Sequence, residues 1–113
     1  MHSIKQGEIW YANSNPIKGS EQAGVRPVVV ESGNMLNQLI DTVIVFPLTT
    51  RIKNYKGNLV LTPNEQNGLA EKSEVLIFHI RSLSKERLTR SIGMITKEDL
   101  AYLKEGLDDI LRY

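Results

Sequence analysis

A polar segment between two strand-like runs holds the residues best suited to chemistry. From Gly19 to Pro27 it combines two glycines, a carboxylate, an amide and an arginine. Pro27 fixes its own φ and disfavours a helical Arg26, so the guanidinium is aimed in a defined direction. A guanidinium donates hydrogen bonds in pairs to phosphate oxygens, which suits phosphate recognition. A structural ion pair is the alternative role for such an arginine.

A second candidate lies where an apolar run ends. Residues 41–46 are rich in β-branched and aromatic side chains, which is typical of a buried strand. Thr49, Thr50 and Arg51 follow soon after, and two hydroxyls beside an arginine can donate hydrogen bonds to an anion. Threonines also cap and turn strand ends without any ligand, so this pattern alone leaves both interpretations open.

Together these motifs resemble the MazF/PemK family of bacterial toxins. The resemblance rests on G-S-E-Q-x-G-x-R-P at residues 19–27 and on P-L-T-T at residues 47–50. It begins at residues 7–10, Gly-Glu-Ile-Trp, and continues through residues 80–82 to the terminal helix, so it covers nearly the whole chain. Members of this family are sequence-specific, metal-independent endoribonucleases of type II toxin–antitoxin modules.

The resemblance implies catalytic roles for Arg26, Thr49 and Glu21. Arg26 would stabilise the charge of the phosphorane, and Thr49 would donate its hydroxyl to the same phosphate. Glu21 is the expected general base for the 2′-hydroxyl, with a pairing to a nearby lysine as the alternative. Arg26 is the other candidate for proton transfer, to the leaving 5′-oxygen, although an unperturbed guanidinium is a poor acid. The expected products carry a 2′,3′-cyclic phosphate and a 5′-hydroxyl.

Further residues are expected to bind RNA. Flanking phosphates would contact the basic stretch after the second motif, and other polar side chains would contact the substrate directly. PemK-type members carry a histidine at the position of Ser20 and an acid at that of Phe78, so a mechanism using those groups does not transfer. His79 is interpreted as a strand residue at the sheet rim. The expected RNA-binding residues are Ser20, Gln22, Thr50, Arg51, Lys53 and Arg81.

Composition limits the possible functions. The chain has 113 residues, no cysteine, two histidines and a net charge of +1. One domain over residues 1–113 is expected. The scarcity of metal ligands argues against a metal site, and no cofactor is expected. Without a long apolar stretch or a signal-peptide core, the protein is expected in the cytoplasm and away from membranes. Positive charge gathers in residues 51–56 and 81–90. This distribution fits a short single-stranded RNA site, and a solvated surface with no partner is the alternative, which the charge alone favours.

The hydrophobic pattern predicts a mainly β (α+β) fold. Regularly spaced short strands suggest a small barrel, and the resemblance implies an SH3-like barrel of the CcdB/PemK toxin type with a C-terminal α-helix. Thr96 is the expected cap of that helix, and Gly106 within it indicates a close contact. Its expected apolar stripe is Leu100, Leu103, Leu107, Ile110 and Leu111. Expected strands are Glu8–Ala12, Val28–Glu31, Thr42–Leu48, Asn58–Leu61, Glu74–Ile80 and Arg90–Met94, with helical turns at Asn34–Ile40 and Ser84–Leu88.

The resemblance also implies partners. We expect a homodimer whose RNA groove crosses both subunits, single-stranded mRNA as the substrate, and neutralisation by a cognate MazE-like antitoxin with an acidic segment. The competing hypothesis is a non-catalytic barrel: a CcdB-like toxin that binds DNA gyrase, or a nucleic-acid-binding module. The combination of Arg26, Thr49 and the G-S-E-Q segment favours the nuclease.

Overall fold

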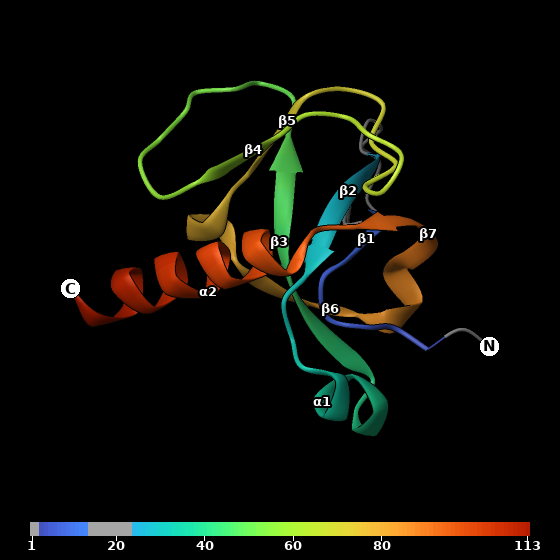
Figure 1. Ribbon diagram of the computed structural model, residues 1–113. Coiled ribbons are helices and arrows are strands. Elements are labelled where there is room, and N and C mark those ends of the chain that lie inside the picture. The colour runs from blue at the N-terminus through green and yellow to red at the C-terminus, as the bar shows by residue number, and fades with distance from the viewer. Residues whose placement is uncertain (1–2, 14–23) are drawn as a thin grey trace.

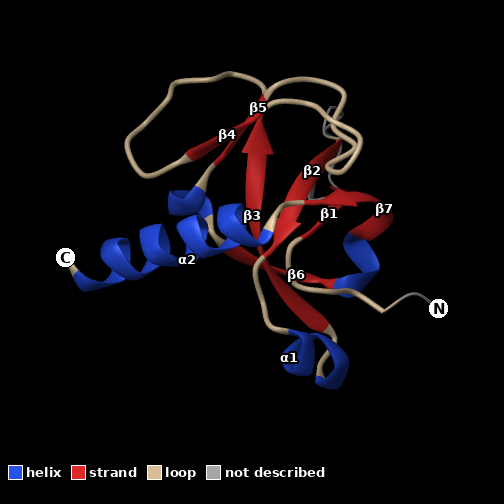
Figure 2. Ribbon diagram, viewed as in Figure 1, coloured by secondary structure: helices blue, strands red, loops and turns tan. Residues whose placement is uncertain are grey.

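The described residues form one curled antiparallel sheet with a helix packed across it (Figures 1 and 2). The computed structural model describes residues 3–13 and 24–113. The strand order is β4-β5-β3-β2-β1-β7, with β6 pairing separately with β3. The strands are β1 Glu8–Asn13, β2 Val25–Val30, β3 Thr42–Thr49, β4 Leu59–Leu61, β5 Ser73–Val75, β6 Arg81–Ser84 and β7 Leu88–Met94; the helices are α1 Asn34–Leu39, η1 Ile77–His79, η2 Lys85–Arg87 and α2 Lys97–Arg112.

Strand β3 organises the sheet because it pairs with three other strands. It pairs with β2, with β6 over Thr42–Val45, and with β5 at Leu48 and Thr49. Apolar side chains are buried on both of its faces, which explains the unbroken apolar run in the sequence. One face contributes Phe46 and Leu48 to a core with Ile9, Val29, Val75, Ile77 and Leu103, and the other contributes Val43 and Val45 to a core with Trp10, Val28, Val30 and Leu83.

Helix α2 closes the first of these cores. The Thr96 hydroxyl accepts a hydrogen bond from Asp99 N over 3.0 Å, so the predicted cap is confirmed. Leu103 is fully buried, and the predicted apolar stripe packs on the sheet except at its last residue, Leu111, which is 75% exposed. A β-carbon on Gly106 would lie 3.0 Å from Ile77 Cδ1 and 3.3 Å from Gly57 O, which confirms the close contact expected there.

Three sequence-based expectations need correction. Strand β2 begins at Val25, three residues earlier than predicted, so it includes Arg26. The predicted strand Glu74–Ile80 ends at Val75, and His79 lies in the 3₁₀ helix η1 rather than in a strand. There the side chain of Asn58 accepts a hydrogen bond from Ile77 N over 3.1 Å, which takes the place of a further strand partner.

Strand β6 was not predicted. Only one of its four residues, Leu83, is buried, so it carries almost no apolar alternation. It pairs with residues Thr42–Val45 of β3, and this long-range contact creates the strand. The local sequence therefore lacked the information that the tertiary pairing supplies.

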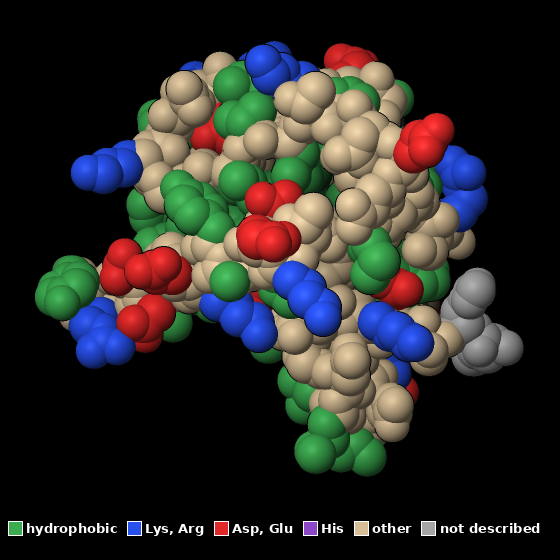
Figure 3. Space-filling view, in the orientation of Figure 1, with side chains coloured by type: hydrophobic (Ala, Val, Ile, Leu, Met, Phe, Trp, Pro, Cys, Tyr) green, Lys and Arg blue, Asp and Glu red, His purple; other side chains and the backbone are tan. Residues whose placement is uncertain are grey.

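Much of the exposed surface of α1 is apolar. The exposed side chains Met35, Leu36, Leu39 and Ile40 belong to this helix and the residue after it. Figure 3 shows green apolar atoms at the tip of the molecule where α1 lies. Among the described helices none combines the length and apolar character needed to cross a membrane.

Candidate active site

Arg26 and Thr49 lie at the same end of two paired strands. The β2–β3 register matches Val28 with Pro47, and Arg26 and Thr49 each lie two residues further along their strands. Because alternate residues of a strand face the same side, both candidates lie on the face that carries Val28 and Pro47. Arg26 is exposed and Thr49 is half-buried. An arginine and a hydroxyl therefore lie at neighbouring strand ends, on the same face of the sheet.

The residues after Thr49 leave the sheet as a basic loop. The Thr49 hydroxyl accepts a hydrogen bond from Arg51 N over 3.1 Å, so the turn begins at the candidate site. Every residue from Thr50 to Lys56 is exposed. The loop joins β3 to β4, and we call residues 50–58 the β3–β4 loop. It places the predicted phosphate-binding side chains Arg51 and Lys53 in solvent near the end of β3.

Arg81 is not brought next to Thr49. It pairs with Val45 at the start of β6, four residues along β3 from Thr49. At the usual strand rise this separation corresponds to roughly 13 Å. Arg81 is exposed and lies on the same sheet face as Thr49, because cross-strand partners face the same side. Arg81 and Thr49 are therefore too far apart to contact one phosphate together.

The candidates Ser20, Glu21 and Gln22 lie outside the described residues.

Two other arginines of the basic stretch at residues 81–90 make contacts with β1. Arg87 Nη1 donates to Asn13 O over 3.0 Å, and the Arg90 guanidinium lies 5.2 Å from the centre of the Tyr11 ring, a cation–π contact. Part of the positive charge in residues 81–90 therefore stabilises the edge formed by β1 and β7.

Sequence analysis missed Glu74, a side chain near the site that accepts four hydrogen bonds. It is fully buried on β5, where it pairs with Thr49 across the sheet. Burial alone would raise the pKa of this carboxyl, but hydrogen bonds from Asn58 and from the loop backbone outweigh it and lower the pKa. The available sequence signal is an acid directly before an apolar run, Val-Leu-Ile-Phe at residues 75–78.

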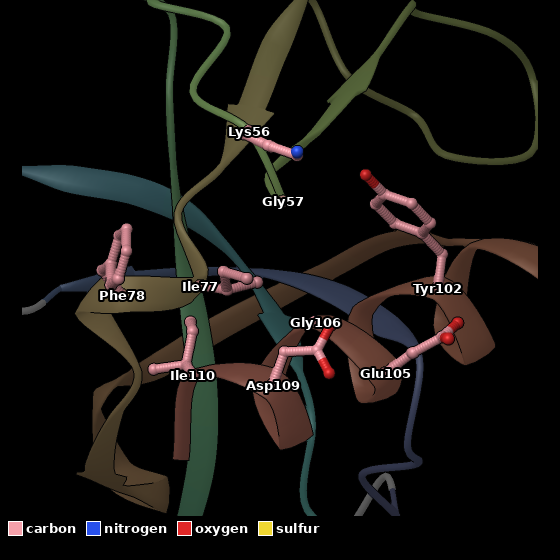
Figure 4. Close-up of a pocket in the computed structure, with 9 residues that line it drawn as sticks. All are labelled: Lys56, Gly57, Ile77, Phe78, Tyr102, Glu105, Gly106, Asp109 and Ile110. Atoms are coloured by element: carbon pink, nitrogen blue, oxygen red, sulfur yellow. The ribbon is translucent and has the colours of Figure 1, made fainter. Parts of the chain in front are cut away.

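A pocket of about 450 Å³ lies behind the β3–β4 loop (Figure 4). Lys56 and Gly57 line it on one side and helix α2 on the other, with Phe78 at its edge. Its lining contains neither Arg26 nor Thr49, so it is separate from the candidate site. No group of three or more histidine, cysteine, aspartate or glutamate side chains in the described part of the chain is arranged to hold a metal ion.

The sequence of this protein matches a known protein family over nearly its whole length. A family model described as a PemK-like, MazF-like toxin of type II toxin-antitoxin system matches residues 5–111. The chain belongs to this toxin family. The match confirms the family expected from the two sequence motifs.

Individual relatives of this MazF-like toxin agree with that assignment. Endoribonuclease EndoA from Bacillus subtilis is 33% identical over 105 residues, which cover 92% of this chain and 90% of that protein. The crystal structure of MazF from Deinococcus radiodurans matches over the whole of both chains with a TM-score of 0.81 and 27% identity. A MazE-MazF structure from the same organism gives 0.84 and 26%, covering 98% of this chain and 97% of that one. The expected mainly β toxin fold, a curled half-barrel with a C-terminal helix, is confirmed.

Proposed function

We propose that this MazF-like toxin is an endoribonuclease that cuts single-stranded mRNA at specific sequences without a metal and thereby inhibits translation and growth. The proposal rests on the register that sets Arg26 and Thr49 on one sheet face, two residues beyond the Val28–Pro47 pair. A relative that is one-third identical is named an endoribonuclease. Residues 1–113 act as a single toxin domain in this proposal.

Each catalytic role follows from the chemistry of cleaving RNA through its own 2′-hydroxyl. Glu21 takes the proton of that hydroxyl, which then attacks the adjacent phosphorus. Arg26 and Thr49 donate hydrogen bonds to the non-bridging oxygens as their negative charge grows. The bond from phosphorus to the 5′-oxygen breaks as that oxygen takes a proton, for which Arg26 is the candidate donor, and the products carry a 2′,3′-cyclic phosphate and a 5′-hydroxyl. Ser20, Gln22, Thr50, Arg51, Lys53 and Arg81 are the proposed RNA contacts.

The proposed partners follow from the family. Structures of MazF from Deinococcus radiodurans include MazE-MazF complexes. We infer that this toxin forms a homodimer in the cytoplasm and is neutralised there by a MazE-like antitoxin whose acidic segment competes with RNA for the basic surfaces. Light scattering at micromolar concentration tests the dimer, and a monomer would contradict it. An antitoxin complex that still cuts RNA at the full rate would contradict the competition.

An RNA digest with end-group analysis tests the activity. The purified toxin is incubated with a long RNA of mixed sequence, and the cut sites and both new ends are mapped. We expect cuts at a recurring short sequence, with a cyclic phosphate on one end and a hydroxyl on the other. Intact RNA together with inhibition of DNA gyrase would instead support the alternative, a CcdB-like binding toxin.

A further inference from the structure

The Glu74 carboxylate is enclosed by donors from the β3–β4 loop. Its Oε1 accepts from Lys53 N over 2.7 Å and from Asn54 N over 2.9 Å. Its Oε2 accepts from Tyr55 N and from Asn58 Nδ2, both over 3.0 Å. Three successive backbone N–H groups thus converge on one carboxylate, and Asn54, at φ 58°, has the left-handed backbone typical of such an anion-binding nest. The loop folds around a charge that the protein itself supplies.

The loop has two further hydrogen bonds, from Arg51 N to the Thr49 hydroxyl and from Asn58 N to Tyr55 O, both over 3.1 Å. Its residues from Thr50 to Lys56 are exposed and form no strand or helix. A buried carboxylate is costly unless hydrogen bonds satisfy it, and in the described part of the chain no ion pair involves Glu74. The four hydrogen bonds therefore stabilise both the buried charge and the conformation of the loop. At its far end Gly57 lies against helix α2 at Gly106 (Figure 4), which anchors the loop's exit.

Glu74 also connects this loop to the candidate catalytic residue. In the β3–β5 register it lies directly opposite Thr49. The same residue is thus the cross-strand neighbour of Thr49 and the acceptor for the backbone of Lys53. Glu74 therefore connects the backbone of Lys53 to the strand position opposite Thr49, while the backbone of Arg51 is bonded directly to the Thr49 hydroxyl.

We propose that Glu74 is a positioning residue for RNA binding, which holds the β3–β4 loop in the conformation that presents Arg51 and Lys53 to RNA phosphates beside Thr49. This inference rests on the proposed function, because it assigns a role within the same RNA site. Glu74 itself is buried and does not touch the substrate.

The test variant is Glu74→Gln. Glutamine keeps the size of the side chain but replaces one acceptor oxygen by an NH₂ group. Both Glu74 oxygens accept from N–H donors, so in either orientation the NH₂ group of glutamine faces donors and cannot accept their hydrogen bonds. The matched control is Asn67→Asp in the loop between β4 and β5. Asn67 is also buried, and it organises that loop by accepting from Asn64 N and Leu69 N and donating to Thr62 O. Both substitutions disturb a buried loop anchor, but only the first loop carries the proposed RNA contacts.

The readouts are cleavage of a fluorogenic RNA and anisotropy with a labelled, 2′-O-methylated strand that cannot be cut. For Glu74→Gln we expect KM and Kd to rise about tenfold with kcat within about twofold, and the slope of log affinity against log salt to weaken by roughly 1, as for lost phosphate contacts. Asn67→Asp should leave KM, Kd and the salt slope unchanged. In an Arg51→Ala, Lys53→Ala background, Glu74→Gln should add little further effect.

The outcomes separate the two proposals. If the wild type binds the labelled strand but does not cut RNA, the proposed nuclease function is wrong. The change in Kd caused by Glu74→Gln then still tests the positioning role of Glu74. If the wild type cuts normally and Glu74→Gln changes KM and salt slope no more than Asn67→Asp does, the positioning role is wrong. A full effect of Glu74→Gln in the double-alanine background would also overturn it. If Glu74→Gln does not fold, Glu74→Asp, which keeps the charge on a shorter side chain, undergoes the same comparison.

Discussion

Asn58 joins the Glu74 carboxylate to helix η1. Its Nδ2 donates to Glu74 Oε2 over 3.0 Å, while its Oδ1 accepts from Ile77 N over 3.1 Å. Asn58 and Glu74 are both buried at the point where β5 ends. The Asn58 amide therefore gives a hydrogen-bond partner both to the Glu74 carboxylate and to the Ile77 backbone N–H. A buried cluster of hydrogen-bonded polar side chains therefore lies beside the end of β3 that carries Thr49.

Replacing either Arg26 or Thr49 by alanine should abolish cleavage and leave the fold intact. Each substitution removes a preorganised donor to the transition state, a loss of about 3–4 kcal/mol or a factor of hundreds. Circular dichroism and a fluorogenic RNA substrate measure the two properties. Arg112→Ala is the matched control, because Arg112 is an exposed arginine on helix α2 that pairs with Asp108 on the same helix. Activity within a few-fold of wild type in both site variants would contradict the assignment.

Cleavage should survive EDTA. The chain has no cysteine and two histidines, so it offers few ligands for a transition metal. The proposed mechanism assigns charge stabilisation to Arg26 and Thr49, the role that a metal fills in other nucleases. The assay compares initial rates with and without chelator. A complete loss of activity that magnesium restores would overturn the proposed chemistry.

The Glu31 carboxyl should make stability fall as pH rises from about 4.5 to about 7. Burial raises its pKa from 4.5 to about 7, against the opposing charge of Lys104, and its Oε1 has no hydrogen-bond partner among the described residues. In this window the folded state keeps a proton that the unfolded state releases, so the free energy of unfolding decreases with pH. Glu31→Gln keeps the shape and removes the titration.

Urea unfolding of wild type and Glu31→Gln at several pH values measures this effect. The variant should gain stability relative to wild type across the window, by at most about 3 kcal/mol, and the difference should level off at higher pH. Glu65→Gln, at an exposed glutamate in the loop between β4 and β5, is the matched control. A difference that does not change with pH would disprove a protonated Glu31 in the folded state.

Gly93→Ala should destabilise the protein strongly. A β-carbon on Gly93 would lie 2.4 Å from the backbone carbonyl oxygens of both Gln66 and Asn67, and backbone atoms cannot rotate away. We expect a loss of about 1–3 kcal/mol or more, the usual cost of overpacking. Gly33→Ala is the control, because nothing lies within 4 Å of its added β-carbon, and it should change stability by no more than about 0.5 kcal/mol. Equal urea midpoints for the two variants would contradict this contact.

The sequence determined the features that depend on neighbouring residues. The apolar run before Thr49 predicted strand β3, and Thr96 predicted the start of helix α2, because strand periodicity and helix capping are local properties. The two motifs were sufficient to indicate the toxin family. Arg26 and Thr49 could therefore be chosen as candidates before any contact was known, whereas Glu21 still lies outside the described residues.

The tertiary structure decided which residues act together. Register between strands is set by long-range burial, so only the fold put Arg26 and Thr49 on one face of the sheet and formed β6 along β3. Glu74 was missed for the same reason. Its donors come from residues 16 to 21 positions earlier in the chain, and no local pattern links a buried acid to a distant loop. That loop takes its shape from a charge buried beneath it, a relationship that exists only after the chain has folded.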